Sequence, residues 1–213
     1  MTEEELRASL PEHLRRCGVP RDVIQGLAEP FETRAMAAYR EWRATNELAL
    51  VLIGAPGCGK SYAAAMLLAE NKNCFRVYLH APGDLPPDWR WSGGFFCGVR
   101  QDLGGPKASW EHLVAIRTRA TETSALVLDD AGTEKGDGED VLFAVLADRY
   151  AAQRRTVITS NLNEANFRAR YGGRLLSRIL GSGRIANVNG PDLRMARPRP
   201  EASGSSDGQA AEP

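Results

Sequence analysis

One stretch of the chain has the spacing G-x-x-x-x-G-K-S, which is typical of loops that bind phosphate. It consists of Gly54, Ala55, Pro56, Gly57, Cys58, Gly59, Lys60 and Ser61. Glycines let several backbone N–H groups converge on one phosphate, and a helix that begins near Gly59 adds its positive end. Lys60 would reach the outer phosphates, and the Ser61 hydroxyl would hold Mg²⁺. The stretch therefore predicts a Walker A loop for ATP and Mg²⁺.

Two further strand ends carry polar residues that suit the same chemistry. The apolar run 125–128 ends in Asp129 and Asp130. This fits a Walker B pattern, in which Asp129 coordinates Mg²⁺ through water and Asp130 polarises the attacking water. The run 156–160 ends at Asn161. A polar residue there lies beside the γ-phosphate in ATPases that insert an extra strand between the two Walker strands.

The elements that must position these residues alternate along the chain. We expect strands at 47–53, 74–79, 125–128, 156–160 and 184–188, and helices at 60–71, 109–123, 141–153, 164–171 and 174–180. This order calls for an α/β fold with a parallel sheet, with ligands at the carboxyl ends of its strands. Helices are also expected at 21–26, at 31–44 and, in two pieces separated by Pro11, at 3–16.

The flanking segments divide the chain further. We expect a short helical extension over 1–45, an ATPase core over 46–195 and a disordered tail over 196–213. The segment 81–108 is rich in glycine and proline and contains Trp89, Trp91, Phe95 and Phe96. These aromatic residues suit either stacking on nucleic-acid bases or anchoring of the loop to the core.

Bulk composition excludes several classes of protein. Lys+Arg and Asp+Glu are 27 each, so net charge indicates no partner, although 168–199 holds eight arginines and the single acidic residue Asp192. That segment suits DNA, phosphate or an acidic neighbour. No apolar run is long enough for a signal peptide or a membrane span. The four cysteines lack C-x-x-C pairing or a histidine at ligand spacing, so we expect no zinc site and a reducing, cytoplasmic setting.

Three runs resemble the DnaC/DnaI helicase loaders. The run 125–134 (ALVLDDAGTE) resembles their Walker B segment, and 156–162 (TVITSNL) resembles the strand whose Asn senses the γ-phosphate. The run 173–179 (GRLLSRI) is similar to their arginine-finger segment. The resemblance covers about residues 14–196. The related IstB-type transposition helpers share the same core.

The resemblance implies an AAA+ ATPase with a five-stranded parallel sheet and a reduced C-terminal lid. It implies that Arg178 is donated to the ATP of a neighbouring subunit and that Arg194 contacts the chain's own nucleotide. Self-association and ATP hydrolysis would then be coupled. The implied partners are a replicative DNA helicase and single-stranded DNA. The loaders carry a separate helicase-binding domain, whereas only about 45 residues precede the first core strand here.

Three other functions stay open at this point. An IstB-like transposition helper would bind duplex DNA and a transposase. A nucleotide-gated adaptor would bind ATP with negligible turnover, in keeping with the short side chain of Asp130 where many AAA+ proteins have Glu. A small-molecule kinase is disfavoured, because no lid or acceptor site is evident.

Overall fold

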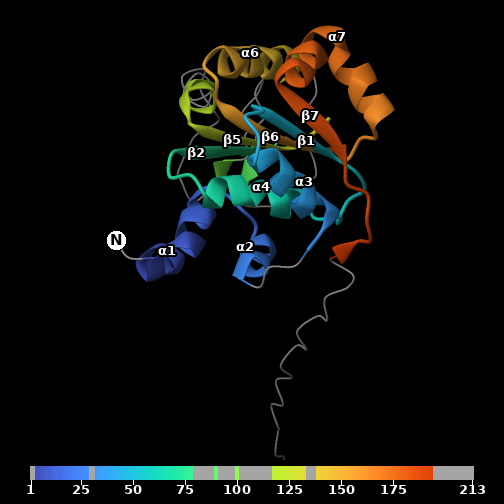
Figure 1. Ribbon diagram of the computed structural model, residues 1–213. Coiled ribbons are helices and arrows are strands. Elements are labelled where there is room, and N and C mark those ends of the chain that lie inside the picture. Colours follow the sequence, from blue (N-terminus) through green and yellow to red (C-terminus); the bar gives the residue numbers. More distant parts are fainter. Residues whose placement is uncertain are drawn as a thin grey trace, which may run out of the picture.

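A five-stranded sheet with the strand order β2-β5-β6-β1-β7 forms the centre of the computed structural model (Figure 1). The structure describes residues 3–28, 32–78, 89–90, 99–100, 117–132 and 138–193. The strands are β1 (Ala49–Ile53), β2 (Cys74–Tyr78), β5 (Ala125–Ala131), β6 (Arg155–Ser160) and β7 (Gly183–Asn187). Every neighbouring pair is parallel. The predicted α/β fold class is confirmed, and β6 lies between β1 and β5 as expected for an inserted strand.

Helices cover both faces of this sheet (Figure 1). One face packs against α6 (Gly138–Ala151) and α7 (Glu164–Ser182), and the other against α1 (Glu3–Arg16), α3 (Arg34–Arg43) and α4 (Lys60–Ala69). Within β1, Val51 and Ile53 belong to the first core, whereas Leu50 and Leu52 belong to the second. Burial on both faces explains why β1 reads as a continuous apolar run.

The long helix α7 consists of two helical pieces joined at a kink. Gly172 has φ 61° and ψ 175°, which is not helical. The expectation of separate helical pieces at 164–171 and 174–180 is therefore confirmed in this sense. Asn163 begins the first piece, because its side chain accepts a hydrogen bond from the backbone N–H of Asn166 at 2.8 Å.

The expected break of the first helix at Pro11 is wrong. The helix α1 runs without interruption from Glu3 to Arg16 and contains Pro11. Proline removes one backbone hydrogen bond at a cost of about 3 kcal/mol. Docking of the end of α1 on α4 compensates, since Leu14 is fully buried and the His13 ring contacts the carbonyl of Leu68. The short helix α2 (Arg21–Ala28) follows.

Part of the segment 81–108 is a small ribbon. Its described residues form β3 (Trp89–Arg90) and β4 (Val99–Arg100), which pair antiparallel. Trp91, Phe95 and Phe96 lie outside the described residues, as does the tail 196–213. Of the helix expected at 109–123, residues 117–122 are described and are helical. Within the described ranges, no helix has both the length and the apolar character that a membrane span requires.

Candidate functional site

The loop between β1 and α4 has the backbone that its glycines predict. Gly57 and Gly59 have φ values of 79° and 92°, a region that side chains other than glycine rarely adopt. A Cβ on Gly57 would also lie 1.9 Å from the Asp192 Oδ1 atom. Gly59 is the residue at which α4 begins, so the positive end of that helix points into the loop. The loop thus has glycine at the positions whose backbone requires it, and its binding of phosphate stays a prediction.

Lys60 lies against this loop and is almost fully buried. Its Nζ atom donates to the carbonyls of Gly54 at 2.8 Å and Ala55 at 2.7 Å, and to the Asn161 Oδ1 atom at 2.9 Å. It also contacts the Cys58 Sγ atom at 3.7 Å. The two carbonyls and the amide oxygen are neutral, so the ammonium charge is available to an anion that enters the loop.

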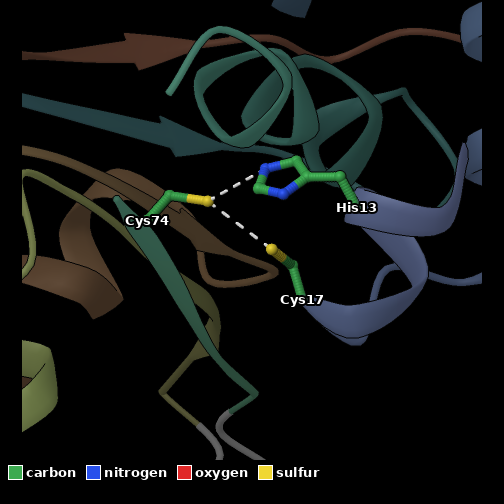
Figure 2. Close-up of side chains that lie close together, drawn as sticks. All are labelled: His13, Cys17 and Cys74. Carbon is green, nitrogen blue, oxygen red and sulfur yellow. Dashed lines mark hydrogen bonds between the residues drawn. The ribbon is translucent and has the colours of Figure 1, made fainter. Parts of the chain in front are cut away.

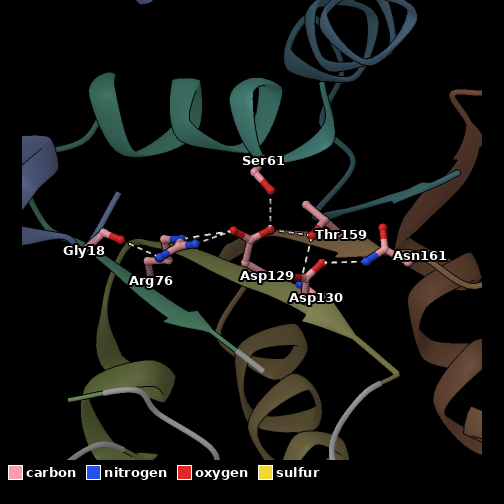
Figure 3. A network of polar contacts seen from close by, with 7 residues as sticks. All are labelled: Gly18, Ser61, Arg76, Asp129, Asp130, Thr159 and Asn161. Carbon is pink, nitrogen blue, oxygen red and sulfur yellow. Dashed lines mark hydrogen bonds and ion pairs between the residues drawn. The ribbon is translucent and has the colours of Figure 1, made fainter. Parts of the chain in front are cut away.

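Asp129 lies at the centre of the polar network in Figure 3 and is completely buried. Its Oδ1 atom accepts from Ser61 Oγ at 3.0 Å and from Thr159 Oγ1 at 2.5 Å. Its Oδ2 atom accepts from Arg76 Nη2 at 2.6 Å and from Nε at 3.1 Å. Burial alone would raise the pKa of Asp129, but the charge of Arg76 and the hydrogen bonds outweigh it and hold that pKa below its ordinary value.

The structure brings Ser61 and Asp129 together, as the motif spacing predicts. A hydroxyl and a carboxylate whose oxygens lie 3.0 Å apart fit the oxygen donors that Mg²⁺ prefers. Asp129 is held in its charged form, which is the form that a cation requires. These two residues could therefore hold Mg²⁺ at the mouth of the loop.

Asp130 adopts a strained backbone next to Asp129. Its φ is 62°, and the pairing of β5 with β6 shifts register between Leu128 and Ala131. This bulge turns the Asp130 side chain away from the buried Asp129 carboxylate. In this orientation, the Asp130 Oδ1 atom accepts a hydrogen bond from the Asn161 Nδ2 atom at 3.0 Å. Its backbone N–H donates to Thr159 Oγ1 at 3.0 Å. Bulges at the ends of strands commonly redirect a side chain next to an active site.

Asn161 joins the two halves of the site. Its amide oxygen accepts from Lys60 and its amide nitrogen donates to Asp130, so Lys60, Asn161 and Asp130 form one continuous chain of hydrogen bonds. The sequence motifs predicted the three residues individually. The structure shows that Asn161, the first residue after β6, connects the phosphate loop to the second carboxylate.

A cavity of about 570 Å³ lies in front of these groups. That volume is within the range of small-molecule sites. The lining includes Pro20, Asp22 and Val23 from the start of α2 and Leu193 from the end of the described chain. The lining also includes the site residues Pro56, Gly57, Gly59, Lys60, Ser61, Arg76, Asp129, Asp130 and Asn161.

Arg76 was missed by the sequence motifs. It lies on β2 with a buried side chain, and besides Asp129 it contacts the carbonyl of Gly18, to which Nη1 donates at 2.5 Å. A basic residue inside the otherwise apolar run 74–79 was the available signal. Arg76 therefore ties the segment after α1 to the carboxylate at the centre of the site.

The segment after β7 crosses the phosphate loop, which the sequence did not predict either. Asn189 Oδ1 accepts from the Ala55 N–H at 3.0 Å, and the Leu193 N–H donates to the carbonyl of Gly57 at 3.0 Å. Arg34 on α3 donates to the Asn189 carbonyl at 3.1 Å. Arg194, the next residue in the chain, lies outside the described residues.

Arg178 does not lie in this cavity. It is exposed on α7, and its guanidinium carbon lies 4.8 Å from the centre of the Phe143 ring on α6. The lining of the cavity does not include it. Within one chain, therefore, the structure brings together Lys60, Ser61, Asp129, Asp130 and Asn161 but leaves Arg178 apart.

Comparison with known proteins gives similarity of fold. No family model and no curated protein matches the chain. A crystal structure of the DnaC helicase loader is 22% identical over 73% of this chain and 88% of its own, with a TM-score of 0.47. A DnaI crystal structure is 22% identical over 90% of this chain and 93% of its own, also at 0.47. Domain III of the Thermotoga maritima replication initiation protein DnaA is 19% identical over 75% of this chain and 62% of its own, with a TM-score of 0.49.

Proposed function

We propose that this chain binds ATP with Mg²⁺ in the cavity at the carboxyl edge of the sheet and hydrolyses the γ-phosphate. The main support is that the Lys60–Asn161–Asp130 chain and the Ser61–Asp129 pair line one cavity. A cation for the phosphates, oxygen donors for Mg²⁺ and a second carboxylate for water are the parts that phosphoryl transfer to water requires.

Each residue then has a defined role. The loop N–H groups and Lys60 bind the outer phosphates, and Lys60 has only to exchange a neutral acceptor for a phosphate oxygen. Ser61 and Asp129 would hold Mg²⁺, which neutralises phosphate charge when it is bound. Asp130 orients the attacking water and accepts its proton, and Asn161 keeps Asp130 facing the cavity. Arg76 positions Asp129 and holds it charged.

The proposed site is completed by a second copy of the chain. Arg178 is exposed and lies outside the cavity lining, which suits a residue that is donated to the ATP of a neighbouring subunit. Arg194 directly follows Leu193, which lines the cavity, and suits a contact with the nucleotide of its own chain. Hydrolysis would therefore depend on ATP-driven self-association.

Substitution of Lys60 tests the site itself. We expect Lys60→Ala to lose ATP binding and phosphate release, whereas Lys72→Ala, which removes an exposed lysine after α4, should behave as wild type. Binding is measured by titration calorimetry and release by a phosphate assay. Equal ATP binding by the Lys60→Ala protein and wild type would contradict the proposed site.

Mixing two inactive variants tests the shared site. Arg178→Ala should bind ATP but turn it over about 10³-fold or more slowly. Mixed with Lys60→Ala, it should regain part of the activity, because one variant supplies an intact loop and the other an intact arginine. Arg168→Ala is a matched control on the same helix, where Arg168 is exposed and paired with Glu164. Absence of any recovery, in mixtures shown to co-assemble, would contradict donation of Arg178 between subunits.

We further propose a role in DNA replication, through a replicative helicase and single-stranded DNA. The support is the resemblance of the 125–134 and 156–162 runs to those of helicase loaders, together with the convergence of Asp129, Asp130 and Asn161 from these runs on one site. The test is binding of the purified helicase from the source organism with and without ATP, and of single-stranded against duplex DNA. Preference for duplex DNA, with no helicase complex in either state, would exclude this role.

A further inference from the structure

Three side chains of types that bind metals lie together where the end of α1 meets the start of β2, outside the lining of the cavity. His13 lies in the last turn of α1, Cys17 directly follows that helix, and Cys74 is the first residue of β2 (Figure 2). The Sγ atoms of Cys17 and Cys74 are 3.5 Å apart, and Cys74 Sγ is 3.4 Å from His13 Nε2. All three donor atoms lie within 4.8 Å of one another. The expectation that the cysteines have no histidine at ligand spacing is therefore wrong.

The separations between the sulfur and nitrogen atoms suit ligands of one shared cation better than a disulfide between the two cysteines. Zinc–sulfur bonds of about 2.3 Å and zinc–nitrogen bonds of about 2.0–2.1 Å place tetrahedral ligand atoms roughly 3.5–3.8 Å apart. The observed separations of 3.5 Å and 3.4 Å are close to these values. A disulfide would instead bring the two sulfur atoms to about 2.05 Å.

We propose that His13, Cys17 and Cys74 form a binding site for Zn²⁺ that is separate from the nucleotide cavity. Two thiolates and an imidazole select a thiophilic cation, whereas Mg²⁺ prefers oxygen donors. Cys74 is buried, and the other two residues are half-buried. The carbonyl oxygen of Leu68 lies 3.0 Å from His13 Nε2 and 3.6 Å from Cys74 Sγ, so an oxygen atom adjoins the three side chains.

Binding requires that His13 exchange a hydrogen bond for the metal. Nε2 cannot both donate to Leu68 and ligate a cation, so the neutral ring must carry its single proton on Nδ1 when the metal is bound. The Leu68 carbonyl keeps a partner in that case, because it also accepts from the Asn71 N–H at 3.3 Å. The exchange therefore leaves no backbone acceptor without a hydrogen bond.

The proposed site would fasten α1 to the sheet next to the Asp129 network. Cys17 precedes Gly18, whose carbonyl accepts from Arg76, and Cys74 lies two residues before Arg76 on β2. A cation that joins Cys17 to Cys74 would thus fix both of the backbone segments that hold Arg76 on Asp129. The metal acts here as a structural clip, whether or not the cavity hydrolyses ATP.

Cobalt substitution tests the site in the reduced full-length chain. We expect one Co²⁺ per chain, with thiolate charge-transfer bands and the d–d bands of tetrahedral coordination, and displacement by Zn²⁺. Cys17→Ser and Cys74→Ser should lose most of the thiolate absorption, and His13→Gln should weaken binding at least tenfold. Cys58→Ser is the matched control, since Cys58 lies in the phosphate loop. Circular dichroism checks that each variant is folded.

Alkylation of the wild-type chain gives a second measurement that needs no variant. Zn²⁺ should slow the modification of Cys17 and Cys74, mapped by mass spectrometry, by tenfold or more. A reduced, folded chain without cobalt–thiolate bands would overturn the proposal. So would bands that persist in the Cys17→Ser and Cys74→Ser proteins, or a Cys17–Cys74 disulfide in a chain that takes up no metal after reduction.

Discussion

Two buried arginines lie at opposite ends of the strands, Arg76 near their carboxyl ends and Arg149 near their amino ends, and the groups around them differ in charge. Arg76 meets the carboxylate of Asp129 at the edge that faces the cavity. Arg149 on α6 lies at the other edge and donates to the carbonyls of Ala120, Thr123 and Arg155 at 2.6–2.8 Å, and to a hydroxyl at 2.8 Å. Burial, followed by the nearby charge of Arg154, lowers the pKa of Arg149 to about 9.

The difference separates a structural arginine from one that serves a site. Arg149 donates hydrogen bonds to backbone carbonyls near the start of β5 and β6. These hydrogen bonds offset the free-energy cost of burying its charge. Arg76 instead compensates a buried carboxylate that is placed for a cation. We therefore expect loss of Arg149 to affect stability alone, and loss of Arg76 to affect stability and the site together.

The largest effect on stability is expected for Arg149→Met. It removes the arginine donor from three backbone carbonyls, each such loss costing about 1–3 kcal/mol, so the free energy of unfolding should fall by roughly 4–6 kcal/mol. Urea unfolding followed by circular dichroism measures this. Arg117→Met, at an exposed position, is the control. A loss below about 1 kcal/mol would show that the carbonyls do not depend on Arg149.

Arg76→Met should cost somewhat less, about 3–5 kcal/mol, because it leaves Asp129 buried and unpaired. The double variant Arg76→Met with Asp129→Leu should recover most of that stability, since replacing both partners of a buried pair by apolar groups is often neutral. Binding of Mg²⁺–ATP should be weakened in both proteins. If the Arg76→Met protein kept full affinity for ATP, the claim that Arg76 serves the site and Arg149 does not would be wrong.

The smallest effect concerns the two described residues other than glycine that have positive φ, Asp130 at 62° and Gln153 at 54°. Replacing either by glycine should relieve strain and raise the free energy of unfolding by about 0.5–1 kcal/mol. Only Asp130→Gly should also lose turnover. If Gln153→Gly lost as much turnover as Asp130→Gly, the strain at Asp130 would have no special link to the site.

The sequence predicted those parts of the site that are local in the chain. The phosphate loop, the end of β5 and the end of β6 each carry their chemistry within a few residues. A parallel sheet then brings strand ends to one edge, so the meeting of Lys60, Asp129 and Asn161 followed from fold class. Arg178 and Arg194 stay predictions, because one lies apart from the cavity and the other lies outside the described residues.

Contacts between distant segments could not be predicted in the same way. Arg76 is 53 residues from Asp129 and 58 residues from Gly18 along the chain. No local sequence pattern predicts contacts between residues so far apart. The group of His13, Cys17 and Cys74 contains no C-x-x-C pair, and Cys74 lies 57 residues from Cys17. The spacing of four residues between His13 and Cys17 was the one local signal of this group. The predicted break at Pro11 was wrong for the same reason, because docking of α1 on α4 outweighs the local free-energy cost of proline.

Phosphate release at saturating ATP and Mg²⁺, compared between wild type and Asp130→Asn, tests the central claim most directly. The substitution keeps the size of the side chain and the contact with Asn161 but removes the base. We predict that turnover falls by about 10²–10⁴-fold while ATP binding is retained, and that Asp148→Asn, at an exposed position on α6, changes neither. Equal turnover of Asp130→Asn and wild type would contradict hydrolysis at this carboxylate.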